Sequence, residues 1–223
     1  MIKKLSLFFA LIIAFQVQAQ DNYLGDGPYS QLIIRGVMLI NGDGSPPRGP
    51  MDIVVENNKI VRMQIVGYPG VKINEKRRPK LKRGGHELDA NGMYLLPGFI
   101  DMHGHIGGKA QGANSEYVFK LWMAHGITTV REPSGRGVKY TNDLKRKSNT
   151  HTIVAPRIIG YTSFGQGSKK PISTAKMARD WVRQNARNGA DGIKFFGAEP
   201  KIMTAALDEN KKLGLGSAMH HAQ

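Results

Sequence analysis

The sequence predicts an α/β fold whose C-terminal part is a parallel sheet, and two observations lead to this prediction. From about residue 94, strand-like apolar runs alternate with helical segments that end near glycine. Before that point, apolar runs follow one another with only short polar turns between them. Alternating strands and helices are typical of parallel sheets, whereas closely spaced strands form hairpins. We therefore expect a small β domain over residues 20–93 and a parallel α/β domain over residues 94–223.

The small β domain is predicted from its apolar runs and its turns. The runs occupy residues 32–34, 37–40, 53–55 and 60–63. The pair Asn57-Asn58 separates the last two runs, and asparagine tolerates the left-handed conformation that tight turns require. The spacing therefore predicts a hairpin at Asn57-Asn58.

The α/β domain is predicted from five strands with helices in most of the gaps. The expected strands cover residues 94–100, 127–130, 152–159, 193–196 and 217–221. The expected helices cover residues 115–124, a segment that Thr174 caps and Gly189 closes, and a segment that begins at Pro200 and ends at Gly214.

A (β/α)₈ barrel fits this alternation better than a doubly wound sheet does. The doubly wound fold would be expected to carry a glycine-rich phosphate loop, but the spacing Gly160 to Gly165 is followed by Gln166-Gly167, where such a loop requires Lys and Ser or Thr. A whole barrel takes about 250 residues. Because the sequence ends at Gln223, after the fifth strand, we expect a barrel that is truncated after about five strands.

A pair of histidines follows the first expected barrel strand. His103 and His105 are separated by one residue, so their imidazoles can project from the same face of a strand end and converge on one cation. An isolated H-x-H is more often a surface accident than a ligand pair. Here it ends an apolar, buried-type strand that runs from Tyr94 to Ile100, which favours a metal site.

This stretch resembles the first barrel strand of the amidohydrolase superfamily, whose motif is P-G-x-x-D-x-H-x-H. Pro97, Gly98, Asp101, His103 and His105 fill every fixed position. The resemblance is to metal-dependent hydrolases, closest to the imidazolonepropionase-like branch. It implies a TIM-type barrel of the amidohydrolase kind, one or two divalent ions, most plausibly Zn²⁺, and hydrolysis of C–N bonds by metal-activated water. It also implies that Asp101 orients a metal ligand rather than binding metal itself.

Lys194 is the second candidate residue, because it lies inside the apolar strand Gly192 to Phe196. It could reach past the strand end to water. A buried lysine with a lowered pKa could instead react with carbon dioxide to form an anionic carbamate. The resemblance implies the second reading, with Lys194 carboxylated and bridging two metals.

The last expected strand ends in two adjacent histidines, His220 and His221. Side chains alternate along a strand, so only one of the two can point into the barrel. The resemblance implies a metal ligand here. We favour His220 as this ligand, with His221 as the second choice. The alternative is that the two histidines form an exposed polar strand end that binds no metal.

The N-terminus predicts export. Lys3 and Lys4 precede an apolar run from Leu5 to Phe15, and a cleavage site can follow Ala19. This pattern is typical of a signal peptide over residues 1–19 rather than of a membrane span, which needs about 20 apolar residues. We expect a periplasmic or secreted protein with no membrane contact after cleavage. The chain has no cysteine, so any metal must be held by nitrogen and oxygen ligands.

Basic residues are concentrated in one segment, and they account for much of the formal net charge of +15. They are Lys72, Lys76, Arg77, Arg78, Lys80, Lys82 and Arg83. Such a run is usually a solvated loop. Nucleic-acid binding is the minority alternative, because the segment lacks interleaved aromatic residues and any recognisable reader motif.

These observations predict a metal-dependent amidohydrolase that acts on a small-molecule amide, either a cyclic amide or a dipeptide-like substrate. The resemblance assigns the family's sixth-strand histidine and eighth-strand aspartate to strands that this sequence does not contain, so we expect the activity to be incomplete in this chain. The alternatives are a non-catalytic metal-binding remnant and a basic nucleic-acid binder. We expect no nucleic-acid partner, and association into a homo-oligomer is left open.

Overall fold

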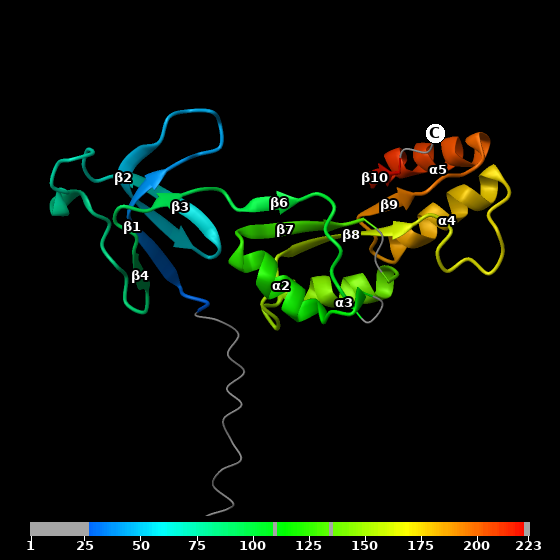
Figure 1. Cartoon of the computed structure of the whole chain (residues 1–223), viewed down its shortest axis with the longest axis horizontal. Coiled ribbons are helices and arrows are strands. Elements are labelled where there is room, and N and C mark those ends of the chain that lie inside the picture. Colours follow the sequence, from blue (N-terminus) through cyan, green and yellow to red (C-terminus); the bar gives the residue numbers. More distant parts are fainter. Residues whose placement is uncertain (1–26, 109–110, 134–135, 221–223) are drawn as a thin grey trace, which may run out of the picture.

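The computed structural model describes residues 27–108, 111–133 and 136–220. The expected signal peptide, the start of the small β domain and His221 lie outside these residues. Two sheets make up the described chain, and Figure 1 shows the small sheet at one end of the molecule and the parallel sheet with its helices at the other.

The small sheet is built from β1 (Gln31–Leu39), β2 (Arg48–Glu56), β3 (Lys59–Ile65), β4 (His86–Asp89) and β5 (Tyr94–Leu95). The strands are ordered β3-β2-β1-β4, and β5 also pairs with β1. Asn57 and Asn58 have φ angles of 49° and 61° and join the antiparallel strands β2 and β3. The predicted hairpin is therefore confirmed. A single 3₁₀ turn, η1 (Glu75–Arg77), lies in the connection between β3 and β4.

The second sheet is entirely parallel and has the order β10-β9-β8-β7-β6. Its strands are β6 (Phe99–Asp101), β7 (Ile127–Glu132), β8 (Arg157–Ser163), β9 (Gly192–Phe195) and β10 (Gly216–Met219). The intervening helices are α2 (Ser115–Ala124), α3 (Val138–Asn149), α4 (Ala175–Arg187) and α5 (Pro200–Lys212). Sequential strands with a helix in each gap form the curled half of a (β/α)₈ barrel, as the sequence predicted.

Helices cover the parallel sheet through two apolar clusters. Under α2 and α3, the buried side chains are Ile106, Phe119, Val130, Leu144 and Ile158. Under α4 and α5, they are Ala178, Trp181, Val182, Ile193, Phe195, Ile202, Ala205 and Ala206. Helix starts follow the predicted signals, since the Thr174 side chain accepts a hydrogen bond from the Met177 N–H and Pro200 occupies the first turn of α5.

The apolar run at residues 94–100 does not form one buried strand, so that prediction was wrong. Tyr94 and Leu95 pair with β1 in the small sheet, whereas Phe99 to Asp101 pair with β7 in the parallel sheet. Pro97 separates the two strands because it has no N–H to continue a ladder. Phe99 and Ile100 are each 58 % exposed, so β6 is not of the buried type either.

Three further features were absent from the sequence-based expectations or differ from them. The strand expected at residues 152–159 begins only at Arg157, because the segment up to Pro156 is irregular. Helix α3 was not predicted at all. His86 lies in β4 and stacks on Tyr29 with ring centroids 4.4 Å apart. Across the described part of the chain, no helix combines the length and the apolar character needed to cross a membrane.

Candidate metal and catalytic site

The two histidines of the motif lie directly after β6. Their rings are in edge contact, with centroids 5.4 Å apart and planes at 78°. Asp101 Oδ1 accepts a hydrogen bond from the His103 backbone N–H at 2.9 Å, so Asp101 holds the main chain of His103 rather than its ring. Gly104 is required between them, because a Cβ there would lie 2.4 Å from Val130 Cγ2. The turn after β6 is therefore pressed against β7.

Glu132, at the end of β7, contacts the second histidine. Its Oε1 lies 3.2 Å from His105 Nδ1, and its Oε2 accepts the Ile106 backbone N–H at 2.7 Å. The Glu132 side chain is almost fully buried, whereas His105 is 42 % exposed. Sequence analysis did not identify this residue. The only signal was a carboxylate at the C-terminal end of a barrel strand.

Lys194 lies in β9 and is 2 % exposed. Its Nζ lies 5.5 Å from the centroid of the Phe196 ring. No carboxylate among the described residues forms an ion pair with it. Burial, reinforced by the positive charge of Arg131, lowers the pKa of Lys194 below its ordinary value. The buried amine is thus shifted toward its neutral, nucleophilic form.

His220 follows β10 and faces the histidine pair. Its ring lies 6.4 Å from the His103 ring, with the planes 22° apart, and 4.7 Å from the Phe196 ring. Its backbone N–H donates to the Phe195 carbonyl at 3.1 Å, which extends the pairing between β10 and β9. The structure therefore brings His103, His105, Lys194 and His220 to the same C-terminal edge of the sheet.

Positive charge gathers at this edge. The pKa of His103 is lowered by burial first, and then by the charges of Lys194, His105, His220 and Arg131. Arg131 is fixed there because its Nε donates to the Met102 carbonyl at 2.7 Å, with its guanidinium 5.3 Å from the Tyr161 ring centroid. Burial and repulsion by the neighbouring cations both favour the neutral imidazole of His103, which is the form that binds metal.

The residues fit a divalent ion by the kind of donor they offer. His103 and His220 supply imidazole nitrogens, and carboxylation of Lys194 would add an oxygen donor. Within residues 27–108, 111–133 and 136–220, no three His, Cys, Asp or Glu side chains are grouped closely enough to hold an ion without rearrangement. His103 and His220 therefore offer two nitrogen donors at this edge. A third ligand would come from carboxylated Lys194 or from rotation of a histidine side chain.

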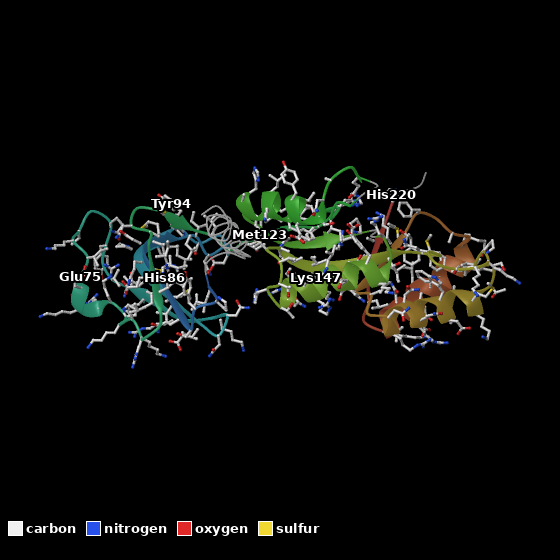
Figure 2. All side chains as sticks on the ribbon, turned by 90° about the horizontal axis from the view of Figure 1, so that it is seen from below. Glu75, His86, Tyr94, Met123, Lys147 and His220 are labelled. Atoms are coloured by element: carbon white, nitrogen blue, oxygen red, sulfur yellow. The ribbon has the colours of Figure 1, made fainter. Side chains whose placement is uncertain are left out.

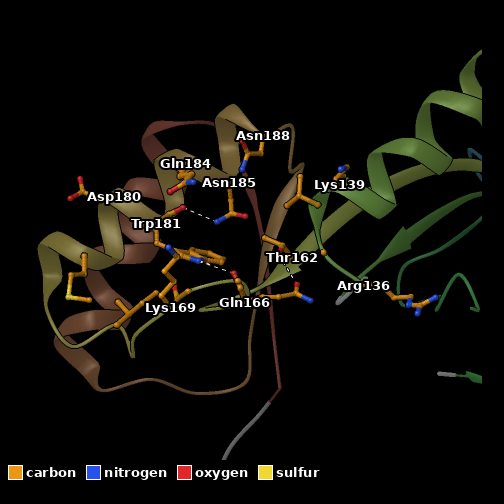
Figure 3. Close-up of a pocket in the computed structure, with 16 residues that line it drawn as sticks. Arg136, Lys139, Thr162, Gln166, Lys169, Asp180, Trp181, Gln184, Asn185 and Asn188 are labelled. Atoms are coloured by element: carbon orange, nitrogen blue, oxygen red, sulfur yellow. Dashed lines mark hydrogen bonds between the residues drawn. The ribbon is translucent and has the colours of Figure 1, made fainter. Parts of the chain in front are cut away.

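A separate cavity of about 640 Å³ is lined by residues of α3, α4 and the segment after β8 (Figure 3). Its wall is held by a hydrogen bond from Trp181 Nε1 to the Gln166 carbonyl at 3.2 Å and by one from Asn185 Nδ2 to the Trp181 carbonyl at 2.9 Å. None of the candidate site residues lines it. The candidate metal-binding residues at the strand ends are therefore separate from the lining of this cavity.

No family model matches the chain. The chain is 36 % identical over 109 residues to an N-acyl-D-aspartate deacylase of Alcaligenes xylosoxydans xylosoxydans and 30 % identical over 105 residues to an N-acetylglucosamine-6-phosphate deacetylase of Lysinibacillus sphaericus. It is 29 % identical over 142 residues to an adenine deaminase of Methanoculleus marisnigri. All three relatives point to the amidohydrolase superfamily.

Solved amidohydrolase structures share its fold. A structure described as a putative prolidase from Bifidobacterium longum superposes with a TM-score of 0.66 at 21 % identity, covering 86 % of this chain and 50 % of that one. A molinate hydrolase superposes with a TM-score of 0.66 at 16 % identity, covering 88 % of this chain and 54 % of that one. The three curated relatives match over 48 %, 60 % and 47 % of this chain, which is only 18 %, 26 % and 22 % of their own lengths.

Proposed function

We propose that this amidohydrolase chain contributes the metal-binding half of a hydrolase that cleaves C–N bonds in a small amide. The substrate class would be a cyclic amide or a dipeptide-like amide. One observation carries the proposal: His103, His105, Lys194 and His220 converge at the C-terminal edge of the parallel sheet. The names of the relatives, a deacylase, a deacetylase and a deaminase, support C–N chemistry.

One or two divalent ions held at this edge, Zn²⁺ by the resemblance, would polarise the substrate carbonyl and lower the pKa of a coordinated water toward neutrality. His103 would offer a neutral imidazole because its pKa is lowered. Asp101 would keep the backbone of His103 in place through the 2.9 Å bond to its N–H. Glu132 would accept a hydrogen bond from the Nδ1–H of His105, so that Nε2 of that ring would be the atom that binds the metal.

Lys194 would supply an oxygen ligand by carboxylation. Its neutral amine attacks the carbon of carbon dioxide, a C–N bond forms, and one proton is released to solvent, so that the product is an anionic carbamate. The lowered pKa of Lys194 favours this reaction because only the unprotonated amine is a nucleophile. The positive charge of Arg131 would attract the negative carbamate, whereas it repels the protonated amine of Lys194.

Two further expectations remain proposals. We propose export to the periplasm or beyond, on the basis of the N-terminal sequence alone. We also propose that the partner of the site is a small amide and not a nucleic acid, because the convergent residues are metal-ligand types and lie at barrel strand ends.

Metal content and hydrolysis measured on the same preparations test the proposal. Zinc is titrated into the purified 223-residue chain, into a His103→Ala/His105→Ala variant and into a His125→Ala/His151→Ala control. Each is then assayed for amine release from N-acyl amino acids, dipeptides and cyclic amides. We expect stoichiometric zinc in the wild type and control and none in the site variant, and we expect any amine release to occur only in the proteins that hold zinc. Equal zinc in all three would refute the site. Bound zinc without any hydrolysis would refute the C–N hydrolase function for this polypeptide and leave a metal-binding remnant.

A further inference from the structure

A basic loop, defined here as residues 66–85 between β3 and β4, has no role in the proposed chemistry. Within it, Arg78 turns inward, and its guanidinium bonds the buried carboxylate of Asp52 at 3.0 and 3.1 Å. Lys82 pairs with Glu56. The remaining cations of the loop are exposed and form no ion pair or hydrogen bond through their side chains with any other described residue; they are Lys72, Lys76, Arg77, Lys80 and Arg83. A fixed excess of positive charge therefore faces solvent.

The same loop presents an exposed apolar turn. The Val71 N–H donates to the Tyr68 carbonyl at 3.1 Å, and Gly70 has a φ of 75°, the value that a type II turn with proline before it requires. Tyr68 is 65 % exposed and Val71 is 62 % exposed. An aromatic and an aliphatic side chain thus protrude directly beside Lys72.

This loop is held in one arrangement by the small sheet. The Val66 N–H donates to the Pro50 carbonyl at 3.0 Å, and the Asn74 N–H donates to the Val66 carbonyl at 2.9 Å. The Lys82 N–H donates to Gln31 Oε1 at 2.9 Å. Little ordering entropy would therefore be lost if the loop bound a surface.

The loop also occupies an end of the molecule. Figure 1 shows it on the side of the small sheet that faces away from the parallel sheet, and Figure 2 shows long side chains with nitrogen tips spreading outward around Glu75. Cations and an apolar turn on a projecting end can meet a broad surface without hindrance from the barrel strands.

We propose that the basic loop docks on an anionic lipid surface, with the Tyr68–Val71 turn at the level of the headgroups. Clustered lysine and arginine are attracted to anionic headgroups, and tyrosine favours the membrane–water interface. Single-stranded nucleic acid would require successive aromatic platforms in a groove, whereas the loop has Tyr68 as its one aromatic residue. This inference departs from our sequence-based expectation of no membrane contact, and it does not depend on the proposed hydrolase activity.

Vesicle co-sedimentation of the full chain tests this inference. Vesicles of phosphatidylcholine alone are compared with vesicles that contain phosphatidylglycerol. The loop variant replaces with glutamine the five cations Lys72, Lys76, Arg77, Lys80 and Arg83. The matched control replaces five exposed cations of the barrel part, Lys139, Lys169, Lys170, Lys201 and Lys211, so both variants have the same net charge. All proteins keep the same residues 1–26, so the apolar run at 5–15 contributes equally.

We expect the wild type and the control to bind anionic vesicles, and we expect the loop variant to bind them roughly 3,000-fold more weakly, at about fivefold per cation for five cations. A Tyr68→Ser/Val71→Ser variant should also lose lipid binding while retaining the same affinity for heparin or single-stranded DNA. Equal loss in the loop variant and the control would overturn the proposal in favour of general charge attraction. Tighter binding to DNA than to vesicles, unchanged by Tyr68→Ser/Val71→Ser, would overturn it in favour of a nucleic acid.

Discussion

Glu132 Oε1 lies 3.2 Å from His105 Nδ1, while the other oxygen of the same carboxylate accepts the Ile106 N–H. The two oxygens therefore fix both the ring and the backbone next to it. A carboxylate that orients a ligating histidine contributes to metal affinity although it does not touch the ion.

Replacing Glu132 with Gln should weaken zinc binding by about 10- to 100-fold. Glutamine has one acceptor oxygen in place of two, so either His105 or the Ile106 N–H loses its partner. The matched control is Glu116→Gln, an exposed carboxylate in the first turn of α2. Competition with a chromophoric chelator measures the affinity. Unchanged affinity in Glu132→Gln would show that the contact does not orient the ligand.

Lys194→Met should stabilise the metal-free chain while abolishing its chemistry. The lysine is 2 % exposed, and methionine removes a buried cation at similar volume. We expect the free energy of unfolding to rise by on the order of 1 kcal/mol. The control Lys201→Met, at an exposed position of α5, should change it by less than about 0.5 kcal/mol. Denaturant unfolding gives both values. A lower stability in Lys194→Met would mean that the ammonium has a stabilising environment.

Sequence and structure agree where short-range patterns determine the outcome. The spacing of His103 and His105, the apolar context of Lys194 and the expected strand end at His220 predicted the four convergent residues. The alternation of strands and helices predicted the parallel sheet. The structure places His220 beside His103, whereas His221 lies outside the described residues. Whether each binds metal stays a prediction.

The remaining features depend on information that no short window of sequence contains. Glu132 contacts a residue 27 positions away, so only the fold reveals the pair. Helix α3 was missed because it is mostly polar and because Gly137, its N-cap, makes no side-chain cap bond. The apolar run at 94–100 was read as one strand, since sequence could not show that Tyr94 pairs with β1 while Phe99 pairs with β7.

The pH dependence of metal binding should reflect the lowered pKa of His103. Protons compete with the ion for the imidazole, so binding should persist below pH 6.5, the ordinary histidine pKa. In the metal-free chain, folding stability should rise with pH between the folded and unfolded pKa values, because the unfolded state binds more protons there. Lys194→Met removes one repelling cation and should raise the pKa of His103. Histidine NMR titration measures this, and a wild-type value at or above 6.5 would contradict it.

The small sheet contains a buried carboxylate whose loss should be more damaging than any surface substitution. Asp52 is fully buried and accepts hydrogen bonds from Arg35 at 2.8 Å, from Arg78 and from the Gly36 N–H at 2.9 Å. Burial would raise the pKa of Asp52, but the bonds from Arg78 and Arg35 outweigh it and hold that pKa below 3.8. Its contribution is therefore present above pH 3.8 and is lost as the pH falls through the folded pKa.

Asp52→Asn should lower the free energy of unfolding by about 3 kcal/mol, because two guanidinium groups lose their charged partner. Asp143→Asn removes only exposed ion pairs with Arg146 and Lys147 on α3 and should lower it by at most about 1 kcal/mol. Urea unfolding at neutral pH compares the two variants with the wild type. Because Arg78 anchors the basic loop to β2 through Asp52, the first variant should also loosen residues 66–85 in hydrogen exchange. Equal destabilisation by both substitutions would show that Asp52 does not organise the small sheet.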